Sequence, residues 1–187
     1  MSGTGIVADR LITGEDLARM ADVGPCELLD GRVVSMAPTG DAHGGVELRF
    51  GKALDAHVAP RKLGKVRVGE VGINIRFDPD RVRAADVLYI SNERHARRSR
   101  ERAFLDVAPE IVVEVLSPQD RAIDLHQKLA DYFSVGVRLV WVADPEARIV
   151  HAYRSLTDVS AVGMGDLLTA EDILPGFVVT VASLFEE

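Results

Sequence analysis

Two carboxylates stand in or beside strongly apolar runs of this chain. Asp86 directly precedes the apolar residues 87–90, and Glu114 lies inside the aliphatic, mostly β-branched run 111–116. Such runs are typical of buried strands. An ionised carboxylate is costly there unless a cation, hydrogen bonds or a raised pKa compensates for it. With the ammonium group of Lys128 nearby in the sequence, the two acids could form a Mg²⁺-dependent phosphodiesterase site.

Phosphodiester cleavage builds negative charge on the scissile phosphate, and this charge defines the role expected of each residue. We expect Asp86 and Glu114 to hold Mg²⁺, with Mn²⁺ as a substitute and the Val115 carbonyl as a further ligand. Such an ion polarises the phosphoryl oxygen and lowers the pKa of a bound water. Lys128 is expected to orient that water or to neutralise the transition state. Glu27, beside a predicted hairpin, is a third candidate catalytic acid.

Each of these residues also has a purely structural interpretation. Asp86 could cap a backbone amide at a strand edge, Glu114 could be a buried acid paired with an Arg, and Glu27 could be a strand-edge charge. Lys128 follows Asp124 by four residues, a favourable helical pair worth only about a few tenths of a kcal/mol. The sequence alone leaves both interpretations open.

Composition limits the class of protein. The chain has 187 residues and a net charge of −7, which suit one domain over residues 1–187 that is not a generally basic nucleic-acid binder. The single Cys26 suits a reducing compartment. Neither a secretory signal nor a membrane-spanning run is recognisable. We therefore expect a cytoplasmic protein without a membrane segment, and residues 1–10 are a candidate disordered tail.

The densest positive segment is residues 94–102, which contain five Arg and one His. Such a run is usually a solvated loop, but in an acidic chain it is the expected contact surface for a nucleic-acid backbone. His43, at a predicted helix start, could touch a phosphate or cap the helix. Nucleic acid is the expected partner, with DNA favoured, and a homodimer is left open. The candidate nucleic-acid-binding residues are His43, Arg94, Arg97, Arg98 and Arg100.

The order of the expected elements predicts an α/β protein with a mixed central sheet and helices on its faces. Thr13 is the expected N-cap of a helix that ends near Met20. Asp30-Gly31 predicts a β-hairpin between residues 26–29 and 32–36. A second helix is expected to end before Pro60. The remaining expected elements are strands at 66–77, 87–90, 111–116, 139–143 and 148–153, a charged loop at 94–102 and a helix at about 121–133.

The order of motifs is similar to that of the Uma family of restriction-endonuclease-like proteins, within the PD-(D/E)XK nuclease superfamily. The resemblance covers about residues 11–185 and implies the restriction-endonuclease-like fold, in which a central mixed sheet carries the catalytic acids. The matching segments are Cys26-Glu27-Leu28-Leu29-Asp30-Gly31, Ala37-Pro38 with His43, Ala85-Asp86-Val87, Ala108-Pro109-Glu110, Val113-Glu114-Val115-Leu116-Ser117-Pro118, Lys128 with Tyr132, residues 136–145 and Leu174-Pro175-Gly176-Phe177.

The chain departs from the superfamily pattern at two positions. Ala85 stands where the superfamily has Pro, and Leu116 stands two residues after Glu114, where the superfamily places its Lys. The apolar Leu116 side chain can do no acid–base or electrostatic work. The resemblance implies that Lys128, on the following helix, takes the place of that Lys.

Two other classes of function remain open on the sequence. One is a catalytically inactive or partner-regulated module that binds nucleic acid or protein and keeps its acids for structure. The other is a different metal-dependent phosphohydrolase that acts on nucleotides or RNA. A Gly-rich phosphate loop of the Walker type is missing from the sequence, which argues against a nucleotide triphosphatase.

Overall fold

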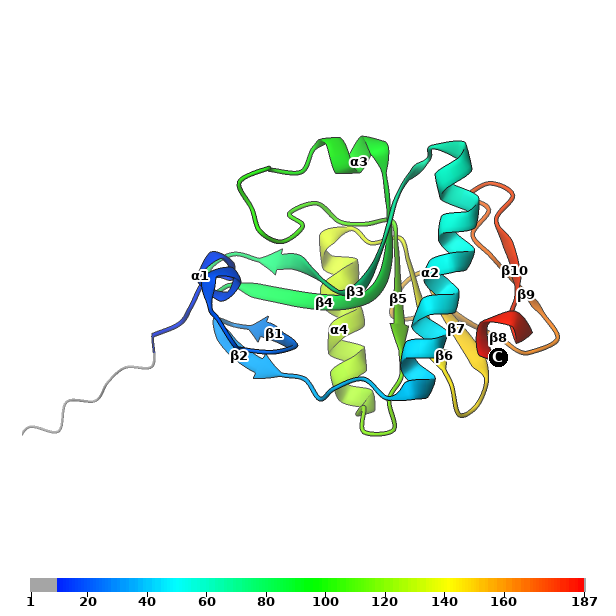
Figure 1. Ribbon diagram of the computed structural model, residues 1–187, viewed down its shortest axis with the longest axis horizontal. Helices are drawn as coiled ribbons and strands as arrows, with labels where there is room; N and C mark the ends of the chain where they lie inside the picture. Colours follow the sequence, from blue (N-terminus) through cyan, green and yellow to red (C-terminus); the bar gives the residue numbers. More distant parts are fainter. Residues whose placement is uncertain (1–9, 187) are drawn as a thin grey trace, which may run out of the picture.

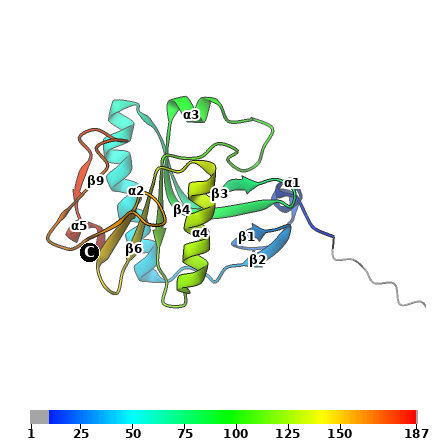
Figure 2. The ribbon, with the colours of Figure 1, turned by 180° about the vertical axis from the view of Figure 1, so that it is seen from behind.

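An eight-stranded mixed sheet forms the centre of the computed structural model, with α2 on one face and α4 on the other (Figures 1 and 2). The structure describes residues 10–186, so the expected tail, residues 1–10, lies outside the described residues except for Arg10. The sheet order is β2-β1-β4-β5-β6-β7-β8, and β3 pairs with β4. Only β5 and β6 pair in parallel among the described strands. The predicted mixed α/β architecture is confirmed.

The elements have the following bounds. The strands of the central sheet are β1 (Cys26–Leu29), β2 (Arg32–Ser35), β3 (Gly64–Arg76), β4 (Arg81–Ser91), β5 (Ile111–Val115), β6 (Leu139–Asp144), β7 (Ile149–Tyr153) and β8 (Val159–Val162). A separate pair consists of β9 (Leu167–Thr169) and β10 (Val178–Thr180). The helices are α1 (Gly14–Arg19), α2 (Asp41–Arg61), α3 (Asn92–Ala96), α4 (Ala122–Val135) and α5 (Ala182–Phe185).

Local sequence signals explain the first helix and the hairpin. The Thr13 hydroxyl accepts a hydrogen bond from the Asp16 amide, and the Asp16 carboxylate accepts one from the Thr13 amide, which forms a capping box at the start of α1. Asp30 and Gly31 join β1 to β2 with φ values of 54° and 75°. Positive φ at both positions suits the right-handed twist of a hairpin. Both predictions are confirmed.

Two predictions about boundaries and loops are wrong, and two short strands were not predicted. The second helix does not end before Pro60, because α2 continues to Arg61 and Lys62 closes it in the left-handed conformation. A Pro in the final turn costs only one hydrogen bond, so the helix tolerates it there. The charged loop at 94–102 begins inside α3, whose N-cap is Ser91. The strands β8 and β9 were not predicted, since both are short and largely exposed.

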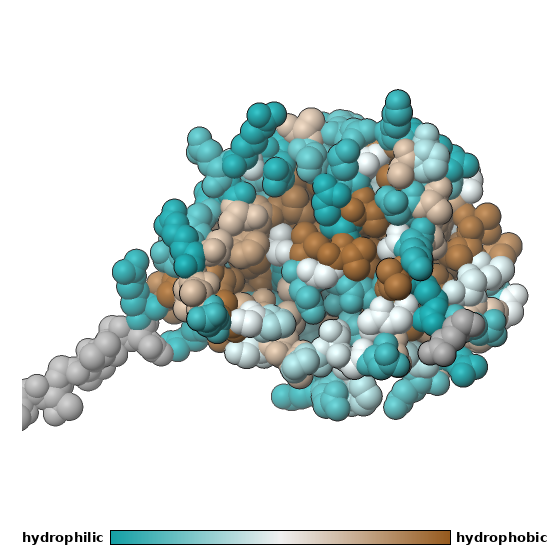
Figure 3. Space-filling view, in the orientation of Figure 1, coloured by the Kyte–Doolittle hydropathy of each residue, from teal (hydrophilic) through white to brown (hydrophobic). Residues whose placement is uncertain are grey.

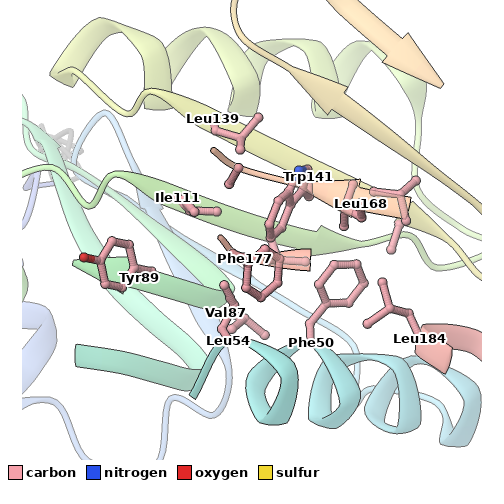
Figure 4. Packing of buried hydrophobic residues seen from close by; sticks show 14 of the residues in the cluster. Phe50, Leu54, Val87, Tyr89, Ile111, Leu139, Trp141, Leu168, Phe177 and Leu184 are labelled. Atoms are coloured by element: carbon pink, nitrogen blue, oxygen red, sulfur yellow. The ribbon is translucent and has the colours of Figure 1, made fainter. Parts of the chain in front are cut away.

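Two apolar clusters hold the layers together. Between the sheet and α2, the fully buried Trp141 stacks on Phe177 at 5.7 Å between ring centroids and meets Phe50 at 6.0 Å (Figure 4). Between the sheet and α4, Leu129 and Tyr132 pack against β4, β5 and β6. The predicted core position of Trp141 is confirmed. Among residues 10–186, no helix is both long and apolar enough to cross a membrane.

Candidate active site

Asp86 and Glu114 are brought together by the pairing of β4 with β5. These strands are antiparallel, with Val87 opposite Val113. The next residues beyond this pair are Asp86 and Glu114. The Asp86 carboxylate accepts a hydrogen bond from the amide of Val115, the neighbour of Glu114, and the charge of Asp86 raises the pKa of Glu114, so the two carboxylates lie close together. Both residues are buried, with 7% and 6% of their surfaces exposed. The prediction that the two acids lie on neighbouring strands is confirmed.

Both carboxylate oxygens of Glu114 are held by side chains of α4. The Lys128 Nζ atom donates to Glu114 Oε2 at 2.6 Å, and the Tyr132 hydroxyl donates to Oε1 at 2.6 Å. Lys128 and Tyr132 are one helical turn apart, so both point from the same face of α4. The predicted contact of Lys128 with Glu114 is confirmed, whereas Asp124 lies 3.9 Å from Arg121.

Burial dominates the electrostatics of this pair. The pKa of Glu114 is raised to about 8, mainly by burial and also by the charge of Asp86, against the opposing effect of Lys128. Burial alone would lower the pKa of Lys128, but the charges of Glu114, Glu27 and Asp86 outweigh it and raise that pKa. The negative charge around Glu114 is therefore only partly compensated by protein groups.

Asp86 connects this pair to α2. Its Oδ2 atom accepts a hydrogen bond from the Val115 amide at 2.7 Å and lies 3.3 Å from His43 Nε2. Burial lowers the pKa of His43, but its contact with Asp86 outweighs this effect, so the pKa is raised. The other ring nitrogen, Nδ1, is buried without a hydrogen-bond partner and lies 4.0 Å from Glu47. The His43 ring is thus a neighbour of the acids, and a phosphate contact from it stays a prediction.

Glu47 was not predicted as part of the site. It follows His43 by four residues on α2, which is the spacing of side chains that share one helix face, and this spacing is the signal that could have identified it. Burial and the charge of Asp86 raise the pKa of Glu47. Its Oε1 atom accepts a hydrogen bond from the Gly69 amide of β3 at 2.9 Å.

Glu27 is a second acid that contacts Lys128, in addition to Glu114. Its Oε1 atom is 3.4 Å from Lys128 Nζ and accepts a hydrogen bond from the Ala84 amide, while Oε2 accepts one from Arg83 at 2.6 Å. Burial would raise the pKa of Glu27, but the charges of Lys128 and Arg83 outweigh it and lower the pKa. Glu27 is thus an ion-paired neighbour of the site. The chain of ion pairs continues from Arg83 to Asp131, Arg81 and Asp30.

The basic loop lies away from the acids. Arg94 donates to the carbonyl oxygens of Ala108, Pro109 and Gly136, so much of its guanidinium faces the protein. It also lies 3.3 Å from Glu110, just before β5, whereas Glu114 is near the end of that strand. Four residues of strand span about 13 Å. Figure 1 accordingly shows α3 and the beginning of α2 at opposite ends of the molecule.

The arginines that follow in the basic loop differ in how far they are already engaged. Arg97 pairs with Glu93 on α3. Arg98 and Arg100 form no ion pair among residues 10–186. A contact with nucleic acid therefore stays a prediction, with Arg98 and Arg100 better placed to offer free charge than Arg94 or Arg97.

The site offers carboxylate oxygens, which are the kind of ligand that a hard divalent ion prefers. Among residues 10–186, no three His, Cys, Asp or Glu side chains are arranged to surround one ion. The carboxylates of Asp86 and Glu114 are oxygen donors of the kind that Mg²⁺ prefers, and the raised pKa of Glu114 shows that protein groups compensate its negative charge only in part. Each Glu114 oxygen accepts one hydrogen bond and keeps a second lone pair that could bind an ion.

A mixed sheet with two acids on adjacent strands, followed by a helix that carries a Lys, defines a restriction-endonuclease-like protein. Residues 15–182 match the Uma2 family, described as "Putative restriction endonuclease", and the chain belongs to this family. This membership confirms the resemblance inferred from the order of motifs.

One solved structure shares the fold over nearly the whole chain. It is described as a "putative nuclease belonging to DUF820 from Anabaena variabilis ATCC 29413". The TM-score is 0.78 and the identity 16%, with 93% of this chain and 97% of that chain covered. At this identity the likeness shows the fold alone. Among curated proteins, none matches the chain.

Proposed function

We propose that the protein is a metal-dependent endonuclease that hydrolyses phosphodiester bonds of nucleic acid, with DNA as the favoured substrate. One observation carries the proposal: the acids of two adjacent strands, Asp86 and Glu114, are buried together with Lys128, whose ammonium group is 2.6 Å from Glu114. Stability alone does not require such a buried ion pair, because well-packed apolar residues of similar volume often stabilise a fold equally well. The family description and the described nuclease with the same fold support the same function.

The proposed cofactor is Mg²⁺, which Mn²⁺ can replace, held by Asp86, Glu114 and the Val115 carbonyl. Such an ion, when bound, polarises the scissile phosphate and lowers the pKa of a bound water. The protein groups do the positioning. The Val115 amide and His43 fix the Asp86 carboxylate. In this proposal the ammonium group of Lys128 lies beside the phosphate and stabilises the negative charge that develops there.

The direct test incubates the purified protein with plasmid DNA, single-stranded DNA and RNA, with Mn²⁺ and then with a chelator. We expect cleavage that the chelator stops and that Glu114→Gln abolishes, because the amide removes the charge that holds the ion. Glu110→Gln is the matched control, since Glu110 is equally buried but pairs with Arg94 before β5. Cleavage that survives chelation, or that Glu114→Gln retains, contradicts the proposal.

A binding module is the second candidate, and one observation favours it. Both oxygens of Glu114 are already satisfied by Lys128 and Tyr132, as in a purely structural ion pair. Calorimetric titration with Mn²⁺ separates the two candidates. A nuclease predicts binding that Glu114→Gln removes, whereas a binding module predicts no Mn²⁺ binding at this position in either protein.

A further inference from the structure

Two cavities open beside β3, one at the beginning of the strand and the other from Arg67 to Gly72. One has a volume of about 370 Å³ and is bordered by Lys62, Lys65 and Arg67, with Asp55 as its acid. The second, of about 270 Å³, is bordered by Arg67, His95 and Arg98. We call Lys62, Lys65, Arg67, His95 and Arg98 the β3 basic patch. Arg67 belongs to both cavities, so the patch is continuous.

The cations of this patch are kept free of acidic partners. Among residues 10–186, Lys62, Lys65 and Arg98 form no ion pair, and Arg67 donates only to the Val66 carbonyl. In contrast, arginines of the neighbouring strand such as Arg83 are neutralised by buried acids. Unpaired cations that border cavities in a chain of net charge −7 create a local positive potential that attracts anions.

The members of the patch lie close enough to act on one another. Burial lowers the pKa of His95, and the charges of Arg98, Arg67 and Lys65 lower it further. These residues come from the edge strand β3 and from the segment that begins with α3. Figure 3 shows a mainly hydrophilic surface at the upper end of the molecule, where Figure 1 places α3 and the end of α2.

The position of the patch relative to the acids suits an extended polyanion. Arg67 lies opposite Leu88 and Lys65 opposite Ile90, two and four residues along β4 from Asp86. At about 3.3 Å per strand residue, Lys65 is about 13 Å from the level of Asp86. A DNA duplex advances about 3.4 Å per base pair on each strand, so this distance corresponds to about four base pairs.

We infer that the β3 basic patch binds the phosphate backbone of duplex DNA about four base pairs from the bond that is cleaved. The inference rests on the proposed function. Lys62, Lys65 and Arg67 supply charge without aromatic partners in the larger cavity, which indicates backbone contact rather than base stacking. The patch therefore contributes affinity and orientation, and the acids contribute chemistry.

The test measures binding separately from cleavage. The full chain carrying Glu114→Gln is titrated with a fluorescent mixed-sequence DNA duplex over a range of salt concentrations. The patch variant adds Lys65→Gln and Arg67→Gln, and the control variant adds Arg19→Gln and Arg148→Gln, which remove the same charge from exposed positions elsewhere. We expect the slope of log K against log salt to become shallower by about 1.8 in the patch variant, because each lost phosphate contact removes about 0.9.

Several outcomes overturn the inference. One is a slope in the patch variant equal to that of its parent, and another is an equal change in the control variant. A third is self-association with an unchanged slope, because cations on an edge strand can also serve to prevent strand pairing between copies. Tighter binding of an RNA competitor overturns the assignment to DNA. The absence of DNA binding by the chain that carries only Glu114→Gln also contradicts the inference. The proposed function is decided separately, by chelator-sensitive cleavage with the unsubstituted chain.

Discussion

The ammonium group of Lys128 lies 2.6 Å from Glu114 in a buried ion pair between α4 and β5. Glu114 is the only ionisable residue of β5, and Lys128 reaches it from the next helix. The superfamily position for a Lys, two residues after Glu114, is occupied here by Leu116. The ammonium group at Glu114 is thus supplied by a residue of α4 and not by a residue of β5 or its end.

Removal of Lys128 alone should destabilise the fold strongly. At a pH above the Glu114 pKa of about 8, Lys128→Met leaves the ionised Glu114 carboxylate buried without its cation, and we expect a loss of about 3–5 kcal/mol in the free energy of unfolding. Adding Glu114→Gln should recover part of this loss, with a coupling energy of about 0.5–3 kcal/mol. Urea denaturation of the single and double variants measures both quantities. Lys52→Met, at an exposed position of α2, is the control, and simple additivity of the two site variants would contradict the ion pair.

Metal binding should depend on pH through Glu114. Burial raises the pKa of Glu114 to about 8, so below that pH the carboxyl is mainly protonated in the metal-free protein. A metal ligand must lose its proton, so Mn²⁺ affinity should rise with pH and level off above about 8. Calorimetric titration at pH values on both sides of 8 measures this trend. In Glu114→Gln this contribution should be absent, and affinity that falls as pH rises would contradict the assignment.

The same shift has a consequence for stability. Because the pKa of Glu114 is higher in the folded chain than its ordinary value of 4.5, the folded state binds more protons between 4.5 and about 8. The contribution of Glu114 to the free energy of unfolding therefore decreases as pH rises through this window. Comparison of the wild type with Glu114→Gln by urea denaturation at several pH values isolates this contribution, and a contribution that increases with pH would contradict it.

Glu27 should act as a positioning residue for Lys128. Its Oε1 atom is 3.4 Å from Lys128 Nζ, while Arg83 and the Ala84 amide hold the same carboxylate. Groups that orient metal-site residues typically change activity by about 10–100-fold when substituted. Glu27→Gln should reduce the cleavage rate at saturating substrate by about that factor and leave KM near its original value. A rise in KM with an unchanged rate would assign Glu27 to substrate binding instead.

Trp141 should contribute more to stability than any exposed apolar residue. It is fully buried and stacks on Phe177. Trp141→Ala leaves a large cavity, and we expect a loss of about 3–5 kcal/mol in the free energy of unfolding. The exposed Ile123 of α4 is the control, since Ile123→Ala should change stability by only about 0.5 kcal/mol. Equal effects of the two substitutions in thermal denaturation would contradict this view of the core.

Local and periodic signals were sufficient for much of the fold. The Asp30-Gly31 turn and the Thr13 cap depend on interactions within a few residues, and both were predictable. The apolar runs around Asp86 and Glu114 identified their strands, because short apolar runs enriched in β-branched residues are typical of buried strands. Helical spacing also predicted that Lys128 would reach Glu114.

Interactions between distant segments could not be predicted in the same way. The contact of His43 with Asp86 depends on how α2 packs against β4, and the Arg83–Glu27 ion pair joins residues 56 positions apart. No local pattern encodes such a pairing. The engagement of Arg94 by backbone carbonyls of the segment before β5 was hidden for the same reason. Composition indicated a positive charge in the basic loop, but it could not show which of its side chains bind other groups of the protein.

The most direct test of the central claim is a crystal structure of the protein soaked with Mn²⁺, with anomalous diffraction data to identify the metal. The proposal predicts one Mn²⁺ ion between Asp86 and Glu114, with oxygen ligands at about 2.0–2.6 Å. Anomalous density only at other positions, with Glu114 still bound to both Lys128 and Tyr132, would contradict a metal-dependent active site at these residues.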